Sequence, residues 1–298
     1  MRKRRSAART AWSAIYPPIL YYAITIVVEI IILIMMMVSY ISAYQLSWED
    51  FNNQAVMQTL LNDFYANAMI ITLVAAFVSC FVFLPLYYAD IRRRRAEGRP
   101  QIGTTATVPK LIWILPLGVA TCLALNLVCS LIPESLASSY EETAELMYSS
   151  RTDIMVMATV VFAPIVEETV FRGLMFRRFR EIMNFWPAAL ISAALFGLFH
   201  MNFVQFVYAT LMGLVLAYVY ERYQSLWASI LMHAAANAFS CVLQYIETPV
   251  SVYYSWTQYF IVMIGCFVIM AMMLLVIRKQ VKPLEENNGT EEPQAAES

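Results

Sequence analysis

Residues 19–44 read ILYYAITIVVEIIILIMMMVSYISAY, a run of 26 positions in which Glu29 is the only charged residue. A helix of about 20 predominantly apolar residues crosses the hydrocarbon core of a bilayer, which is about 30 Å thick. The run therefore predicts a transmembrane helix. It is too long for the core of a signal peptide, and no small-residue cleavage site follows it, so we expect the helix to be retained.

The rest of the chain repeats this pattern. Of its 298 residues 60% are hydrophobic and 14% are charged, whereas soluble domains have about 45–50% apolar and about 25% charged residues. Charged stretches separate eight apolar runs, which predict an all-α fold, a polytopic membrane bundle of about eight transmembrane helices. We expect the fifth and sixth to be short, tilted or incompletely spanning. The predicted spans are Ile19–Tyr44, Ala66–Tyr88, Leu111–Ile132, Ile154–Phe176, Ala188–Phe203, Phe206–Tyr220, Leu226–Leu243 and Trp256–Ile277.

The charges are segregated along the chain, although the net charge is only −1. That balance excludes the basic excess that a nucleic-acid-binding protein needs. Loops on the cytoplasmic side of a membrane collect Lys and Arg. With eight crossings and a cytoplasmic amino terminus, all of the 20 basic residues except Arg151 fall on the cytoplasmic side. The acidic segments fall on the other side, and both termini are predicted to be cytoplasmic.

The chain divides into four predicted regions. Residues 1–153 hold the first three helices and an external loop, residues 154–243 hold four core helices, and residues 244–282 hold the last span. Residues 283–298 are polar and acidic and predict a disordered tail. The five cysteines lie within apolar runs and form no CxxC pair, so we expect them to be small buried hydrophobes.

Ionisable groups inside the spans are candidates for function, because they are costly in lipid. Both histidines of the chain lie in apolar runs, His200 in AALFGLFHMN and His233 in ASILMHAAANAF. A Glu167–Glu168 pair lies in PIVEETVFRG, and Asn237 follows His233 by four residues. A single buried histidine is more often structural, but the combination of these groups favours a functional site.

Helical spacing predicts which of these side chains share a face. Glu168 and Arg172 are four apart and can form an ion pair near the cytoplasmic interface. Glu167 points about 100° away from Glu168 and needs a partner from another helix, a water or a metal. His233 and Asn237 also share a face.

Phe196 and His200 have the same spacing, so the ring can shield the imidazole or simply pack. The predicted depths of the candidates agree only in part. At 1.5 Å per residue, Glu167 and His233 lie roughly 15 and 10 Å from the cytoplasmic edge, whereas His200 lies at roughly 20 Å. The fifth helix must start below the interface or tilt if His200 is to join the others.

These groups suit the hydrolysis of a peptide bond. Glu167 can act as the general base for a water, His200 can hold or polarise that water, and His233 with Asn237 can donate to the oxyanion. The same Glu167, His200 and His233 could instead hold one divalent metal, zinc first among the candidates, with an open fourth position for water. The sequence leaves metal-dependent and metal-free activation open.

Three motifs resemble those of one family. EETVFR (Glu167–Arg172) resembles its EExxxR motif, FGLFH (Phe196–His200) its FxxxH motif and HAAAN (His233–Asn237) its HxxxN/D motif. They occur in the same order in the CPBP intramembrane proteases, also called the Abi family, which include the type II CAAX prenyl endopeptidases and bacteriocin-processing proteins. The resemblance covers about residues 154–243.

The resemblance implies a role for each matching residue. Glu167 would activate the water, His200 would be its partner, and His233 with Asn237 would stabilise the oxyanion, in a conical chamber open toward the cytoplasm. Glu168 and Arg172 match the second Glu and the Arg of the motif. The resemblance also implies an integral protein of a bacterial plasma membrane that cleaves a membrane-associated peptide or protein, as CAAX-type processing, peptide maturation or bacteriocin immunity would require.

Two other functions remain open. Buried Glu, His and Asn also build ion pathways, so a transporter or ion-coupled carrier is the main alternative, although we find no inverted repeat of broken helices. A non-catalytic scaffold of the same fold is the other. The sequence has no HExxH, serine-protease elbow or GxGD motif for the other intramembrane protease types.

Overall fold

A computed structural model describes residues 6–99, 111–244 and 255–281 of the chain, and within these residues every regular element is a helix. The predicted all-α membrane bundle is confirmed, and each of the eight predicted spans corresponds to a helix. The predicted acidic tail, residues 283–298, lies outside the described residues, and the boundaries of the four regions stay predictions. The helices are α1 (Ala7–Tyr44), η1 (Trp48–Asn52), α2 (Gln54–Ala66), α3 (Ala68–Ala96), α5 (Ile114–Cys129), α6 (Glu134–Ser149), α7 (Thr152–Val156), η2 (Met157–Phe162), α8 (Ala163–Glu168), η3 (Thr169–Phe176), α9 (Arg177–Phe179), α10 (Phe185–Leu198), α11 (Phe203–Tyr223), α12 (Leu226–Gln244) and α14 (Trp256–Gln280).

Six helices of the described chain are long and apolar enough to cross a bilayer, namely α1, α3, the continuous α7–α9, α11, α12 and α14. The prediction that the sixth span is short was wrong, because α11 has 21 residues. The side chain of Asn202 caps the start of α11. At its other end the helix continues through polar residues, which a hydropathy pattern does not assign to a span. The third span is short as well, since α5 has 16 residues. The fifth, α10, has 14 residues and is short as predicted.

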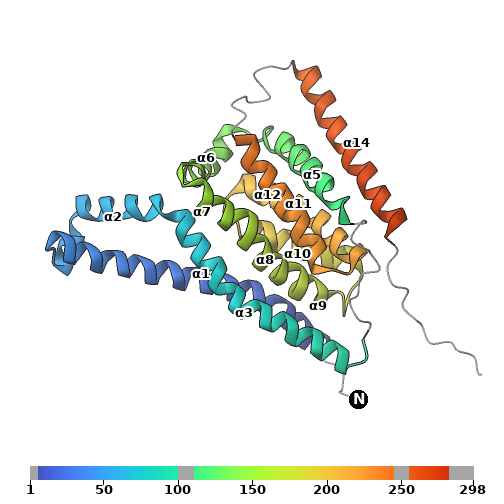
Figure 1. The fold of residues 1–298 in the computed structure, drawn as a ribbon, viewed down its shortest axis with the longest axis horizontal. Coiled ribbons are helices and arrows are strands. Elements are labelled where there is room, and N and C mark those ends of the chain that lie inside the picture. Colours follow the sequence, from blue (N-terminus) through green and yellow to red (C-terminus); the bar gives the residue numbers. More distant parts are fainter. Residues whose placement is uncertain (1–5, 100–110, 245–254, 282–298) are drawn as a thin grey trace, which may run out of the picture.

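The core helices lie between peripheral helices on two sides (Figure 1). Helices α1 and α3 flank one side, and α14 lies on the other side against α5. The most apolar window of α1 has no buried residue, and that of α14 has almost none. Such continuous exposed apolar faces are not compatible with water and are expected to contact lipid.

The helix that carries the Glu–Glu pair is not a regular α-helix. From Thr152 to Phe179 it is continuous, but two π-helical stretches, η2 and η3, lie on either side of α8. π-helical turns are rare and are frequent at functional sites. Pro164, the second residue of α8, has no backbone N–H, which interrupts the hydrogen-bond ladder there.

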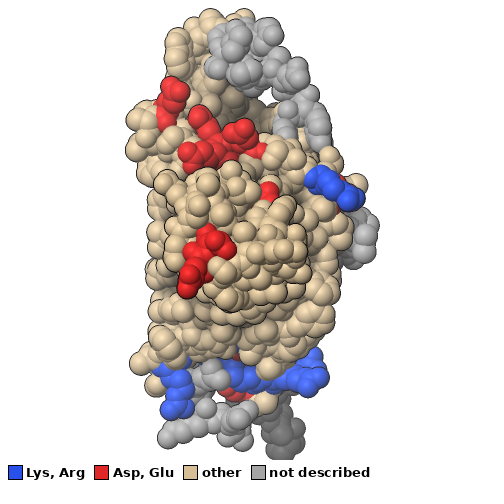
Figure 2. Space-filling model, turned by 90° about the vertical axis from the view of Figure 1, so that its left-hand side faces the viewer, with Lys and Arg blue, Asp and Glu red and all other residues tan. Residues whose placement is uncertain are grey.

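The two ends of the bundle carry opposite charge. On the face shown in Figure 2, most Lys and Arg side chains lie at the lower end and the Asp and Glu side chains gather higher up. We call the two ends the arginine-rich end and the acidic end. The acidic end is where α5 ends and α6 lies, with Glu134, Glu141, Glu142 and Glu145 on α6. The predicted sorting of charge is thus present, and the side that faces the cytoplasm stays a prediction.

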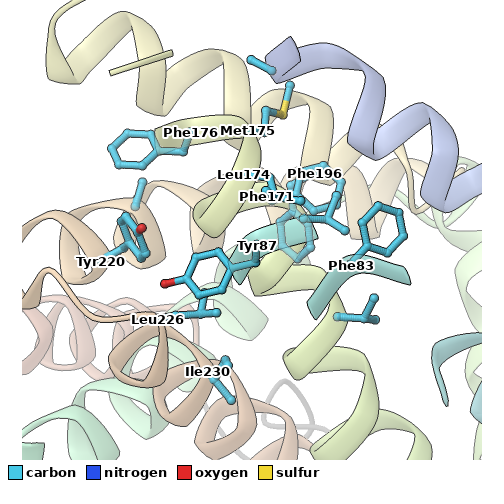
Figure 3. Close-up of a cluster of buried hydrophobic side chains, with 14 of the residues drawn as sticks. Phe83, Tyr87, Phe171, Leu174, Met175, Phe176, Phe196, Tyr220, Leu226 and Ile230 are labelled. Carbon is cyan, nitrogen blue, oxygen red and sulfur yellow. The ribbon is translucent and has the colours of Figure 1, made fainter. Parts of the chain in front are cut away.

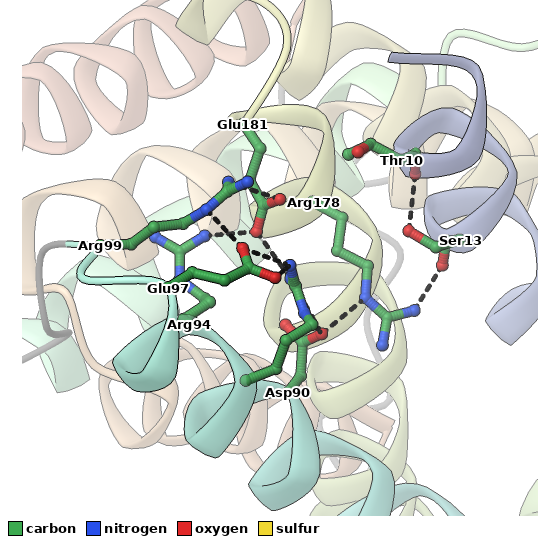
Figure 4. A network of polar contacts seen from close by, with 9 residues as sticks. Thr10, Ser13, Asp90, Arg94, Glu97, Arg99, Arg178 and Glu181 are labelled. Atoms are coloured by element: carbon green, nitrogen blue, oxygen red, sulfur yellow. Dashed lines mark hydrogen bonds and ion pairs between the residues drawn. The ribbon is translucent and has the colours of Figure 1, made fainter. Parts of the chain in front are cut away.

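Ion pairs join the helices at the arginine-rich end (Figure 4). Glu181 accepts from Arg93, Arg94 and Arg99 of the α3 end at 2.8, 2.7 and 2.5 Å. Arg178 pairs with Asp90 at 3.2 Å and donates to the backbone carbonyl of Ser13 in α1. This network holds α1, α3 and the segment after α9 in register.

A buried cluster of large side chains fills the bundle next to this network (Figure 3). Leu174, Met175 and Phe176 of η3 pack there with Tyr220 of α11 and Leu226 of α12, all of them buried. Every residue of η3 is buried. A continuous buried core therefore lies between the Glu–Glu pair and the arginine-rich end.

Candidate functional site

A cavity of about 580 Å³ lies among the core helices. The four predicted catalytic residues line it, Glu167 from α8, His200 from the turn after α10, and His233 and Asn237 from α12. Phe196, predicted to support His200, lines the same cavity. Side chains from separate helices therefore share one enclosed space, as the sequence predicted for them.

Glu167 is placed on the cavity wall by α8. Its side chain is 17% exposed, and its Oε2 lies 3.8 Å from Nε2 of His233. Glu168, one residue on, is wholly buried. The two neighbouring carboxylates thus have different environments, one facing the cavity and the other facing the core.

Glu168 joins Arg172 to His233. Its Oε1 accepts from Nη1 of Arg172 at 2.6 Å, which confirms the predicted ion pair, and it lies 3.0 Å from Nδ1 of His233. The pair is fully buried in the bundle, and its place near the cytoplasmic interface stays a prediction. The contact with His233 was missed by sequence reasoning, because it joins residues 65 positions apart.

The ring of Phe196 holds this group together. The guanidinium carbon of Arg172 lies 4.4 Å from the centre of the ring, which gives the buried cation a second favourable contact. His200 and His233 both meet the same ring edge-on, with centroids 5.0 and 5.8 Å away. Phe196 therefore packs against both histidines, more than the single shielding contact that its spacing indicated.

His200 lies outside the helix in which the sequence placed it. Helix α10 ends at Leu198, and His200 lies in the tight turn to α11, where Met201 has φ +61°. The short α10 therefore ends before His200, and the depths of the candidate residues in the membrane stay predictions. Nδ1 of His200 lies 2.9 Å from the carbonyl oxygen of Phe196. A carbonyl only accepts, so Nδ1 carries a hydrogen, and in the neutral imidazole the lone pair is then on Nε2.

The side chain of Asn237 is held by a backbone carbonyl of the π-helical stretch that lacks a helical donor. The N–H of Ala163 donates to the carbonyl of Ala158, five residues back. The next residue, Pro164, has no N–H to offer the carbonyl of Thr159. Nδ2 of Asn237 donates to that carbonyl at 2.8 Å instead. One amide hydrogen of Asn237 is therefore used to position its side chain.

Among the described residues, no group of three or more His, Cys, Asp or Glu side chains is arranged to hold a metal ion. Glu167 and His233 approach each other, but His200 does not complete a ligand set with them in this arrangement. The side chains as placed do not fit the predicted zinc site. Zinc, or another divalent metal, at these three residues stays a prediction.

Helix α6 forms the outer wall of the cavity and was not predicted to take part. Tyr140, Met147 and Tyr148 of α6 line the cavity, as does Tyr208 of α11. Burial raises the pKa of Tyr140 to about 12, so its hydroxyl stays protonated near neutral pH. The sequence indicated only a polar segment at α6, and Tyr208 lies in an apolar run that carries no signal of a site.

The cavity reaches the surface at the acidic end. Glu134, Glu141 and Thr143 of α6 line it and are exposed. The resemblance implied a chamber open toward the cytoplasm, which the charge pattern places at the arginine-rich end. Within the described chain the cavity lies at the opposite end. A chamber open toward the cytoplasm and a cytoplasmic arginine-rich end therefore cannot both be correct.

Comparisons with known proteins agree with this geometry. Residues 150–239 match the family model described as "Rce1-like: Type II CAAX prenyl endopeptidase Rce1-like". This segment is Rce1-like. The three motifs and all four candidate residues lie within it, and the resemblance that the motifs indicated is confirmed for these residues.

One curated relative also matches the Rce1-like segment. A protein of Bacillus subtilis (strain 168) named "Putative membrane peptidase YdiL" is 33% identical to this chain over 91 residues. Those residues make up 30% of this chain and 37% of that protein, so the similarity spans little more than a third of the curated relative. No solved structure matches the chain.

Proposed function

We propose that the chain is an intramembrane endopeptidase that hydrolyses a peptide bond of a membrane-associated peptide or protein. The observation that carries the proposal is that Glu167, His200, His233 and Asn237 line one cavity within the Rce1-like segment. The name of the Bacillus relative is consistent with such an activity.

In the proposed reaction, Glu167 takes a proton from a water in the cavity, and the water oxygen bonds to the carbonyl carbon of the substrate. His200 accepts a hydrogen bond from that water through Nε2, because its Nδ1 is bound to the carbonyl of Phe196. Glu167 then passes the proton to the leaving amine as the C–N bond breaks. The reaction consumes one water and leaves Glu167 ionised again.

In the proposal, His233 and Asn237 stabilise the oxyanion. Glu168 holds Nδ1 of His233, which directs Nε2 toward Glu167 and the cavity. In the proposal His233 acts as an imidazolium, since its Nδ1 hydrogen is taken up by Glu168 and Nε2 can donate to the developing oxyanion only when both ring nitrogens are protonated. The second amide hydrogen of Asn237 is the other donor. Loss of one such donor typically lowers kcat by about 10²–10³-fold.

The shape of the site favours a hydrolase over the transporter alternative. The cavity lies toward the acidic end, and the buried cluster of Figure 3 fills the bundle between it and the arginine-rich end. A carrier needs a polar path that reaches both sides in turn, and in the described residues this buried cluster separates the cavity from the ion pairs of the arginine-rich end. Metal analysis of the purified protein decides between the metal-dependent and metal-free forms.

The proposal is tested with Glu167→Gln, His200→Ala and His233→Ala. Each should lower cleavage of fluorogenic peptides with a membrane-anchoring segment by at least about 100-fold, the usual contribution of a general acid or base. Activity is measured in proteoliposomes and folding by the melting temperature in detergent. Glu29→Gln is the matched control, because Glu29 is a half-buried carboxyl group of α1 outside the cavity. Full turnover in one variant removes that residue from the mechanism, and full turnover in all three refutes the proposal.

A further inference from the structure

The cavity occupies the half of the bundle nearest the acidic end. Its lining residues Met69 and Thr72 lie at the start of α3, Cys129 and Ser130 lie at the end of α5, and Ser240 lies near the end of α12. These three helix termini all belong to the acidic end. The arginine network of Figure 4 contributes no residue to the cavity wall.

The wall toward the acidic end is thin and weakly anchored. Helix α6 has no buried residue, although it contacts α11, α3, α2 and α7. Its exposed residues Glu134, Glu141 and Thr143 line the cavity, so the cavity is continuous with the surface along α6. A polypeptide segment that passes α6 meets Glu167 with no dense core in its way.

The wall toward the arginine-rich end is closed. After Glu168, all eight residues of η3 are buried, and Arg177 and Arg178 are buried as well. Phe176 packs edge-on against Phe185 and Tyr220, which closes the space between α10 and α11. A polypeptide can pass this way only if the main core of the protein opens, which costs much of the stability of the fold.

We propose that the cleaved segment of the substrate reaches Glu167 from the acidic end, past α6, and that the arginine-rich end gives it no passage. Because basic loops face the cytoplasm, this places the access on the outer side of the membrane. The partner is then a polypeptide segment exposed at the outer membrane surface, such as an exported peptide or the outer end of a membrane helix. This inference rests on the proposed peptidase function and specifies the side from which it works.

The chain contains a natural probe of this access. The thiol of Cys129 lines the cavity and is partly exposed, whereas Cys266 lies on α14 outside it. A small membrane-impermeant methanethiosulfonate is applied to the full chain in right-side-out and in inside-out vesicles, and modification of each cysteine is measured by mass spectrometry. Glu142→Cys and Arg92→Cys, both at exposed positions outside the site, mark the two faces.

Reaction of Glu142→Cys identifies vesicles that expose the acidic end, and we expect Cys129 to react in these vesicles. Reaction of Arg92→Cys identifies vesicles that expose the arginine-rich end, and there we expect modification of Cys129 to fall to background. Cys266 should stay at background in both. Modification of Cys129 together with Arg92→Cys overturns the inference. Modification from neither face also overturns it, since a passage for a polypeptide must admit the smaller reagent.

A second measurement links access to turnover. In Glu141→Cys, a bulky maleimide adduct at the rim of the cavity should abolish peptide cleavage, whereas the same adduct on Arg92→Cys should leave it unchanged. The reverse pattern overturns the inference while leaving the peptidase function intact. If no peptide is cleaved by the unmodified protein, the proposed function fails, and the Cys129 measurement still decides the side of access.

Discussion

At the scale of the residue, Glu168 does two things with one oxygen. It neutralises the buried Arg172 and fixes Nδ1 of His233, and all three side chains are nearly or wholly excluded from solvent. A buried ion pair adds little net stability, but removal of one partner leaves the other charge uncompensated. Glu168 is therefore a positioning residue whose loss affects both the fold and the site.

Glu168→Gln should lower the free energy of unfolding by about 3–5 kcal/mol, because the guanidinium of Arg172 loses its counter-charge in the core. Thermal unfolding in detergent measures the loss. Glu29→Gln, which removes a carboxyl group that pairs with no buried cation in the described structure, is the control. An unchanged melting temperature would show that Arg172 does not depend on this carboxylate.

Asn237 also has a structural task besides the proposed catalytic one. Its amide serves the carbonyl of Thr159, which the N–H-free Pro164 leaves without a helical donor. An unsatisfied buried carbonyl costs about 1–3 kcal/mol. The two roles of Asn237 can be separated, because only the structural role depends on Pro164.

Asn237→Ala should destabilise the protein by about 1–3 kcal/mol. The loss should be smaller when Pro164→Ala is also present, since an alanine at that position supplies a backbone N–H to this ladder. Urea or thermal unfolding of the two single variants and the double variant gives the coupling between the sites. Cleavage should remain low in both variants that lack Asn237. Strictly additive losses would mean that Pro164 does not create the need for this amide.

At the scale of the element, the packing of α10 against α11 sets the position of Arg172. A Cβ built on Gly213 of α11 would lie 3.0 Å from Ala193 of α10 and 3.0 Å from Nη2 of Arg172. There is no room for a methyl group at this crossing. The absence of a side chain at Gly213 thus lets two helices and a buried guanidinium meet, and small residues commonly serve this purpose between membrane helices.

Gly213→Ala should destabilise the bundle by about 1–3 kcal/mol through overpacking and should lower cleavage, because the shift of Arg172 is passed to Glu168 and His233. The matched control is Gly265→Ala on α14, where nothing lies within 4 Å of the added Cβ. That control should be neutral or stabilising by up to about 1 kcal/mol, as expected for Ala in a helix. Equal effects of the two substitutions on the melting temperature would contradict this account.

At the scale of the whole molecule, the separation of charge shapes what the cavity can take. Glu134, Glu141 and Glu167 line it, and no Lys or Arg is found among its lining residues in the described chain. The arginine side chains of the network in Figure 4 lie at the other end, beyond the buried cluster. A cleft lined by one sign of charge attracts ligands of the other sign.

A peptide with Lys or Arg near the cleaved bond should therefore be preferred over its Asp or Glu counterpart by roughly 2–5-fold in kcat/KM, the range of an exposed charge contact. Glu141→Gln should reduce this preference without affecting cleavage of an uncharged peptide. Added salt should reduce it as well, because exposed charges are screened. A preference for the acidic peptide would contradict the electrostatic argument.

Much of this architecture could be predicted from the order of the residues. The eight apolar runs, the sorting of charge and the Glu168–Arg172 pair depend on hydropathy and on spacing within one helix, which are local properties. The candidate residues could also be named, because ionisable groups in apolar runs are few. Their gathering around one cavity was predicted and is observed.

Only the tertiary structure decided how those residues are held and from where they are reached. That His200 lies in a turn, that Glu168 touches His233, and that Asn237 serves the carbonyl of Thr159 depend on contacts between helices far apart in the chain. The wall made by α6 and the closed core at the arginine-rich end depend on packing of the whole bundle. Local hydropathy and helical spacing contain no information about which faces of distant helices meet, and that is why these features appear only in three dimensions.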